Sequence, residues 1–307
     1  MDTPVMIEDT YAEAFPMYAT RVLITAFNKK WVLTAAREAT GFATSIIMSP
    51  AEAGIEGLIS SRYTPDGRVG AYIQIYHRDL VSLKMQVLTR IGQCILTCPT
   101  TAVFDGLPNV KRKISVGRAI ARFGDGFEYE GELYGRRVWR IPVMEGEFII
   151  EDKIGVVKGV AGGNILILAR DLNSGLNAAE NVVKAIRRYC RFVITPFPGG
   201  IVRSGSKVGS LKYRKLGAST NHPYCPLLRD KIKDSKLPPD VNCVYEIVIN
   251  GLSEKYVKLA MGIAIKVASK SPGVVKIDAA NFGGRLGKYC IKLYDALDEV
   301  EKLGIKL

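Results

Sequence analysis

The sequence has no apolar stretch that approaches the roughly 18 consecutive residues of a membrane-spanning helix. Its first residues, 1–4, lack the basic start and the apolar segment of a secretory signal peptide. We therefore expect a cytoplasmic protein with no membrane partner. At 307 residues the chain is longer than one typical hydrophobic core requires, which favours about two domains.

Residues that bind metals are scarce. Only two histidines, His77 and His222, occur, and the 6 cysteines include no C-x-x-C pair. Cys94 and Cys98 are four positions apart on an expected helix, which provides half of a metal site at most. The sequence therefore predicts no metal site, and buried free thiols are the simplest interpretation of the cysteines.

Nucleotide-binding and nucleophile motifs are also missing. The segment 200–207 resembles a phosphate loop, but its lysine comes one position late and Val208 replaces the hydroxyl residue that binds Mg²⁺. No G-x-S-x-G elbow occurs, and the expected strand 72–76 lacks the aromatic pattern of an RNA-recognition module. Neither a prosthetic group nor a covalent intermediate is indicated, which leaves positioned polar groups suited to direct group transfer.

The charge is strongly positive, with 43 lysines and arginines against 30 acidic residues and a net charge of +13. Such an excess favours anionic partners, which include nucleic acids, membrane surfaces and small polyanions. The basic residues are dispersed, however, and no basic tail is present. A solvated basic surface without any ligand is therefore the favoured interpretation of most of them.

One carboxylate stands out in an apolar strand. The segment 243–250 alternates so that Val244, Glu246 and Val248 share one face, while the other face is apolar. This pattern predicts a central strand that is covered on both sides. Desolvation between two valines would raise the pKa of Glu246, as in carboxyl groups that act as catalytic acids or bases. The alternative is a structural glutamate paired with a lysine or arginine.

Hydrophobic periodicity predicts an α+β fold made of two ferredoxin-like (split β-α-β) lobes with duplicated architecture. The expected lobes are residues 1–147, which end in a meander of hairpins, and residues 148–307, which carry Glu246. The expected strands are 21–26, 44–48, 72–76, 164–169, 192–195, 243–250, 274–277 and 289–293. The expected helices are 30–40, 80–96, 175–188 and one that begins at Ser253. Residues 196–239 form a long irregular segment, and the end of the chain forms a short amphipathic helix at best.

Long motifs spread over residues 7–293 resemble one enzyme family, the formylmethanofuran–tetrahydromethanopterin formyltransferases of archaea. The motifs are 7–15, 38–42, 45–54, 123–126, 138–139, 145–148, 159–164, 196–201, 206–210, 218–221, 243–252 and 281–284. Two positions depart from the usual pattern, because Ala43 and Ser49 stand where relatives tend to carry Gly and Cys. Ser49 argues against a cysteine nucleophile at that position.

The resemblance implies reversible transfer of a formyl group from N-formylmethanofuran to N5 of tetrahydromethanopterin, without a metal or a bound prosthetic group. It implies anionic small-molecule substrates rather than nucleic acid, and a homotetramer with its substrate cleft at a subunit contact. It also assigns catalysis to Glu246. The alternative is a catalytically silent relative that serves as a subunit of a formyltransferase/hydrolase complex.

Substrate-binding residues are expected within the same span of the chain, residues 7–293. Glycine-rich loops allow backbone N–H groups to approach a substrate, and arginine or lysine can bind its anionic groups. The candidates are Arg21, Phe197, Gly199, Gly200, Ser206, Lys207, Asn221, Asn281 and Phe282. Thr195, Ser206 and Asn221 are equally explained as polar residues that stabilise turns.

Overall fold

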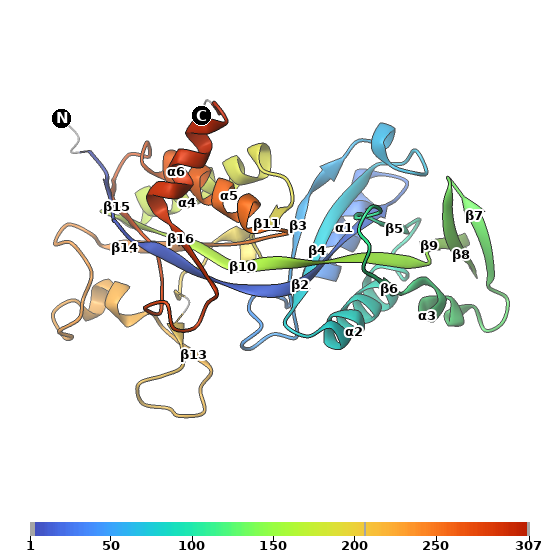
Figure 1. The fold of residues 1–307 in the computed structure, drawn as a ribbon, viewed down its shortest axis with the longest axis horizontal. Helices are drawn as coiled ribbons and strands as arrows, with labels where there is room; N and C mark the ends of the chain where they lie inside the picture. Colours follow the sequence, from blue (N-terminus) through green and yellow to red (C-terminus); the bar gives the residue numbers. More distant parts are fainter. Residues whose placement is uncertain (1–3, 206, 306–307) are drawn as a thin grey trace. The chain divides into compact units, whose positions relative to one another are not determined.

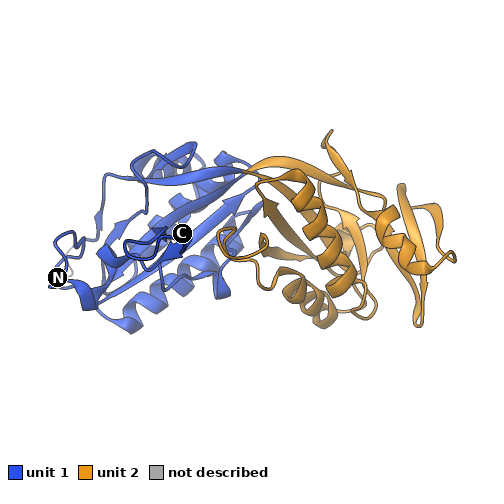
Figure 2. Ribbon diagram, turned by 90° about the horizontal axis from the view of Figure 1, so that it is seen from below, with its two compact units in different colours: residues 1–16, 160–307 blue, residues 17–159 orange. Residues whose placement is uncertain are grey.

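The computed structural model describes residues 4–205 and 207–305. The fold is mixed α/β, with a large sheet and helices (Figure 1). The chain forms two compact units, residues 17–159 (unit 2) and residues 1–16 with 160–307 (unit 1), coloured separately in Figure 2. Among the described residues, no helix is both long and apolar enough to cross a membrane.

Unit 2 is built on an antiparallel arrangement of four strands. Its elements in chain order are β2 (Tyr11–Thr25, from Met17 onward), α1 (Lys29–Thr40), β3 (Glu52–Ile59), β4 (Gly70–His77), α2 (Leu80–Arg90) with a π-helical turn (Ile91–Ile95), and β5 (Ala102–Asp105). The strand order is β3–β4–β2–β5, and each neighbouring pair is antiparallel. The hydrophobic residues of α1 and α2 pack against the sheet in one core.

Local sequence signals explain where the helices of unit 2 begin. The side chain of Asn28 accepts a hydrogen bond from the backbone of Trp31, and Asp79 does the same for Ser82, so each caps a helix N-terminus. Both predicted helices are confirmed within one residue at their start. The capping side chains fix the register in which α1 and α2 present their apolar faces to the sheet.

One predicted strand of unit 2 is wrong. Residues 44–48 form bends and turns, and the strand begins only after Pro50, at Glu52. The hydroxyl of Ser49 donates to the carbonyls of Ser45 and Ala51 and accepts from the backbone of Ser45. Such side-chain bonds to nearby backbone stabilise a turn in place of a sheet ladder.

The expected meander of hairpins is confirmed in the rest of unit 2. Its elements are β6 (Lys113–Ser115), α3 (Gly117–Ala121), β7 (Tyr129–Leu133), β8 (Arg136–Val143) and β9 (Gly146–Glu151). β7, β8 and β9 are consecutive antiparallel strands, and β9 joins the sheet by parallel pairing with β5. The tight turn between β7 and β8 places Tyr134 and Gly135 at positive φ, the conformation that two-residue hairpin loops require.

Unit 1 repeats the same order of elements. They are β10 (Lys153–Ala169, from Val160 onward), α4 (Leu172–Tyr189), β11 (Val193–Ile194), β14 (Cys243–Gly251), α5 (Glu254–Ala268) and β15 (Val274–Asp278). The strand order is β11–β14–β10–β15, again antiparallel throughout. Between β11 and β14, the described residues of the irregular segment form the short strands β12 (Lys207–Val208) and β13 (Ala218–Ser219) and 3₁₀ turns at Pro198–Gly200, His222–Tyr224 and Pro226–Leu228.

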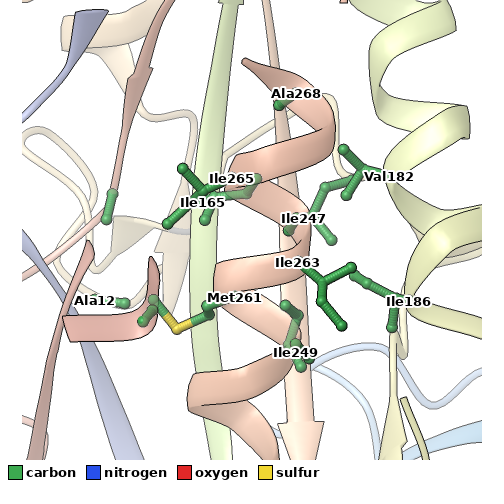
Figure 3. Close-up of a cluster of buried hydrophobic side chains, with 14 of the residues drawn as sticks. Ala12, Ile165, Val182, Ile186, Ile247, Ile249, Met261, Ile263, Ile265 and Ala268 are labelled. Atoms are coloured by element: carbon green, nitrogen blue, oxygen red, sulfur yellow. The ribbon is translucent and has the colours of Figure 1, made fainter. Parts of the chain in front are cut away.

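The core of unit 1 lies between one face of this sheet and the two long helices. Figure 3 shows this cluster, in which side chains of β10 and β14 face those of α4 and α5. The labelled residues are Ala12, Ile165, Val182, Ile186, Ile247, Ile249, Met261, Ile263, Ile265 and Ala268. Since the odd-numbered residues of β14 fill this core, Glu246 must point to the opposite face.

Both ends of the chain belong to unit 1. β1 (Met6–Ile7) pairs in parallel with β15, and β16 (Tyr289–Lys292) pairs with residues 11–14 of β2. The compact units therefore divide at residues 16/17 and 159/160, whereas the sequence suggested a single division at residue 147. Pro16 lies between the residues of β2 that pair with β16 and those that pair with β4.

The C-terminal helix contributes to the hydrophobic core of unit 1. α6 (Leu293–Lys302) buries Leu293, Ala296 and Val300 against α5. Gly262 of α5 makes this contact possible, because a Cβ at that position would lie 2.0 Å from the carbonyl oxygen of Ala296. The helices thus approach each other at a distance that only glycine permits.

Candidate active site

Strand β14 holds Glu246 in a fixed and buried position. Only 1% of the residue is exposed. β10 pairs with β14 so that Leu166 lies directly opposite Glu246. On the other side, the N–H of Val202 donates to the carbonyl of Glu246 at 2.8 Å, and the N–H of Glu246 donates back at 2.9 Å. Glu246 on one face of β14 and Ile247 on the other are both buried, which confirms the expectation of a strand covered on both faces.

The irregular segment covers the face of the sheet that carries Glu246. A small open pocket lies there. It is lined by Leu166, Val202, Arg203, Ser204, Gly205, Asn221, Tyr224, Cys225, Val244 and Glu246. Gly205 has a φ of +67°, and a Cβ there would lie 2.5 Å from Cβ of Asn221, so glycine is required for the two walls to meet.

A second carboxylate occupies the same face two strands away. Leu166 is opposite Glu246 on one side and Asp278 on the other. The hydroxyl of Tyr224 donates to Oδ2 of Asp278 at 3.0 Å. Burial raises the pKa of the Tyr224 phenol, and the negative charges of Asp278 and Glu246 raise it further. Tyr224 therefore remains a neutral hydrogen-bond donor beside two acidic side chains.

Sequence reasoning did not identify Tyr224, Asp278 or Val202 as site residues. Tyr224 lies in a stretch without periodicity, and Val202 reaches Glu246 through backbone atoms only. A usable signal was the nearness of Tyr224 to the motif 218–221, since both belong to one loop. Asp278 ends an expected strand and could have been found as a polar residue at the end of an apolar run.

Two of the predicted site residues accompany Glu246 in this region. Asn221 lines the pocket, and its N–H donates to the carbonyl of Ser204. Lys207 lies on β12, and its Nζ is 3.1 Å from Nδ1 of His222, the residue that follows Asn221. Ser206, a third candidate, lies outside the described residues.

The predicted loop at Phe197 lies on the helical side of the sheet. Gly199 and Gly200 both have positive φ, and the N–H of Gly200 donates to the carbonyl of Phe197. A Cβ at Gly200 would lie 2.7 Å from Oγ1 of Thr195 and 2.9 Å from Val183 of α4. None of these loop residues belongs to the described lining of the Glu246 pocket.

The predicted loop at Asn281 is fastened to β2 by a carboxylate. Glu13, which is 1% exposed, accepts hydrogen bonds from the N–H groups of Phe282 at 2.7 Å, Gly284 at 2.9 Å, Leu286 at 2.6 Å and Gly287. Burial by itself would raise the pKa of Glu13, but the four N–H donors hold it below its ordinary value. The amide of Asn281 donates to the Tyr11 carbonyl at 3.3 Å, so the loop follows the start of β2.

Arg21 is engaged within unit 2. Its Nε and one terminal nitrogen contact the two oxygens of Glu56 at 2.8 and 2.6 Å, and the other terminal nitrogen donates to the carbonyl of Gly106 at 3.1 Å. The guanidinium also lies 3.3 Å from the centre of the Tyr72 ring. Gln74 donates to the same glutamate at 2.7 Å. The Arg21 guanidinium is therefore already paired with groups of unit 2.

The arrangement around Glu246 suits proton transfer and hydrogen bonding. A buried carboxyl group, a neutral phenol and a glycine-containing loop face one pocket. Within residues 4–205 and 207–305, no group of three or more His, Cys, Asp or Glu side chains is placed to hold a metal ion.

Comparison with known proteins covers almost the whole chain. The family described as formylmethanofuran–tetrahydromethanopterin formyltransferase matches residues 2–143, and its proximal-lobe family matches residues 146–296. The curated enzyme of that name from Methanosarcina mazei is 54% identical over 291 residues, which are 95% of this chain and 98% of the relative. The enzyme of the same name from Methanopyrus kandleri is 54% identical over 294 residues, with the same coverage of 95% and 98%.

Solved structures agree with these matches. The formyltransferase of Methanosarcina barkeri superimposes with a TM-score of 0.92 at 54% identity and covers 96% of this chain and 100% of its own. A chain of the formyltransferase/hydrolase complex of Methylorubrum extorquens, solved with methylofuran, gives a TM-score of 0.89 at 45% identity and covers 95% and 96%.

Proposed function

Because this chain belongs to the formylmethanofuran–tetrahydromethanopterin formyltransferase family, we propose that its reaction takes place at Glu246. The protein is a formyltransferase, and it transfers a formyl group from formylmethanofuran to tetrahydromethanopterin. One observation carries the assignment of the site. Glu246 is a 1% exposed carboxyl residue that lines a pocket whose other wall is a polar loop.

The mechanism that fits this site is a direct attack by an amine. The N5 amine of the acceptor attacks the formamide carbon, and a tetrahedral intermediate with a negatively charged oxygen forms. Fixed donors stabilise that oxygen by roughly 3 kcal/mol each. The N–H groups of the loop 203–205 and the amide of Asn221 are the candidates for this role, since they line the pocket with Glu246.

Glu246 then balances the protons of the exchange. It accepts the proton that the attacking nitrogen loses and delivers a proton to the methanofuran nitrogen as the old C–N bond breaks. No net change in protonation results, and the sequence runs equally in both directions. No bound prosthetic group takes part in this scheme, and both methanofuran and tetrahydromethanopterin act as substrates.

Anionic groups on these substrates are the expected partners of the positive charge. We assign this role to Lys207 rather than to Arg21, because the Arg21 guanidinium is occupied by Glu56. Lys207→Met should raise KM for at least one substrate, and added salt should weaken binding, since exposed charges are screened within about 10 Å at 0.1 M. A basic surface that binds nucleic acid would instead retain duplex DNA with a steep salt dependence.

The remaining candidates are assigned to substrate contacts away from the reacting atoms. Phe197, Gly199 and Gly200 present a glycine turn, and Phe282 pairs its ring with Phe15 at 6.4 Å between centroids. Asn281 orders the start of the second loop. An alanine scan of both loops, with KM and kcat measured for each variant, tests these roles. If the loops have only a structural role, both constants will be unchanged in the variants that fold.

We interpret each unit as a ferredoxin-like lobe. The order β-α-β-β-α-β and the strand sequence 2-3-1-4 occur in both units, which supports a duplicated architecture. The active protein is proposed to be a cytoplasmic homotetramer. Light scattering and activity measured over one dilution series test the assembly, and a fully active monomer would contradict it.

A second function is favoured by one comparison. The relative from Methylorubrum extorquens was solved as part of a formyltransferase/hydrolase complex. A chain that served only as a structural subunit of such a complex would be silent alone. Formyl transfer by the purified protein, followed with both substrates and no other protein, separates the two possibilities.

A further inference from the structure

Three side chains of the segment 201–239 form a chain of hydrogen bonds. Nζ of Lys207 lies 3.1 Å from Nδ1 of His222, and Nε2 of His222 lies 3.0 Å from Oδ2 of Asp234. The His222 side chain is 16% exposed, whereas that of Asp234 is 62% exposed. The imidazole is therefore the sheltered member, held between a cation and an acid.

The donor and acceptor chemistry of these groups selects one protonation state. A lysine ammonium has three donors and no acceptor, so Nδ1 of His222 must accept and the imidazole proton must be on Nε2, where it is donated to Asp234. The reverse pattern needs a neutral lysine beside an imidazolium. That pattern would place the proton on the weaker base, because an imidazole is a weaker base than an alkyl amine.

A neutral partner leaves the lysine charge available. Among the described residues, no carboxylate lies within ion-pair distance of the Lys207 ammonium. The bond to His222 uses one of three ammonium donors, and two remain for the oxygens of a ligand. The lysine side chain has four carbons and many rotamers, so a partner that holds the head group lowers the entropy lost on ligand binding.

We propose that His222, oriented by Asp234, is a positioning residue that holds the Lys207 ammonium beside the Glu246 pocket for one carboxylate or phosphate of a substrate. The inference rests on the proposed role of Lys207. Its place in the chain supports it, because His222 directly follows Asn221, which lines the pocket. The strand pair β12 and β13 brings Lys207 opposite Ser219, at the base of the same loop.

Nitrogen-15 NMR of labelled imidazoles tests the tautomer. The sequence has only two histidines, so His77→Gln leaves a single imidazole, that of His222. We expect the spectrum of a neutral ring with its proton on Nε2 at pH 7.5, and a shift of the Nδ1 signal in a His77→Gln/Lys207→Met variant. A proton on Nδ1, or an Nδ1 signal indifferent to Lys207, would overturn the proposal.

Kinetics separate positioning from a general structural role. His222→Phe keeps a planar ring without nitrogen and should raise KM for one substrate about threefold to tenfold, with kcat within twofold, because a charge-assisted hydrogen bond is lost at a partly exposed site. His222→Asn retains an oxygen that accepts from lysine and should restore KM to within about twofold. If neither variant alters KM while Lys207→Met raises it, the positioning role is wrong and the lysine role stands. If Lys207→Met also leaves every KM unchanged, both are wrong.

Discussion

Val202 and Glu246 exchange two backbone hydrogen bonds, of 2.8 and 2.9 Å, at a single isolated bridge. This contact attaches an otherwise irregular loop to the strand that carries the buried carboxyl group. The bridge therefore fixes the position of the loop that forms one wall of the pocket relative to the sheet. A substitution at Glu246 that preserves the backbone leaves the bridge intact, so chemistry and folding can be tested separately.

We expect Glu246→Gln to lower kcat by about 10² or more, because acid–base help contributes on that scale. The melting temperature should change little, since glutamine has nearly the same shape and the bridge to Val202 uses main-chain atoms only. Steady-state kinetics and thermal unfolding measure the two effects. Glu254→Gln, the same exchange at an exposed position of α5, is the matched control. Wild-type turnover in the Glu246 variant would exclude the catalytic role.

Arg21→Met should destabilise unit 2 rather than weaken substrate binding directly. The ion pair with Glu56 is buried, with side-chain exposures of 9% and 6%, and removal of one partner of such a pair costs about 3–5 kcal/mol. The double variant Arg21→Met/Glu56→Leu should recover part of that loss, since no buried charge is left alone. Urea unfolding of the two single variants and the double variant checks this. A stable Arg21→Met protein with a raised KM would instead support a substrate clamp.

The Glu13 carboxylate should make stability depend on pH in the acid range. Its pKa is lowered in the folded protein, so its contribution is fully present above the unfolded value near 4.5 and is lost as the pH falls through the lower folded value. Glu13→Gln should cost about 1.5–3 kcal/mol at pH 7, because the four N–H donors of the loop lose a charged acceptor. The variant should also show a flatter dependence of unfolding free energy on pH between about 5 and 3. An unchanged pH dependence would mean that the carboxylate is not charged in the fold.

Gly262→Ala should loosen the C-terminal helix. An added methyl group would meet the backbone of Ala296, and overpacking of this kind costs about 1–3 kcal/mol. Alanine gains roughly 1 kcal/mol of helix propensity over glycine, so the measured loss is the difference between the two effects. Gly57→Ala is the control, because a Cβ there meets nothing within 4 Å. Chemical denaturation that ranks the two variants equally would show that α6 adapts without cost.

The sequence by itself determined those features that depend on neighbouring residues. The alternation of residues 243–250 established a strand that is apolar on both sides, and the structure confirms it as β14. The starts of α1 and α2 follow from the capping side chains of Asn28 and Asp79, each three residues before the N–H group that it binds. Such capping residues can be recognised in a single sequence. The motifs within residues 7–293 likewise indicated the family, which the comparisons then showed.

Only the tertiary structure decided which distant groups meet. Arg21 is matched to Glu56 across 35 positions, and Glu13 receives the loop at Phe282 across 269. Tyr224 meets Asp278 across 54 positions through a loop that has no hydrophobic period. The register of β10 between β14 and β15 likewise places Leu166 between Glu246 and Asp278, and a pairing register is a property of assembled strands. A single strand's pattern states which residues face the same way, but not what lies opposite them.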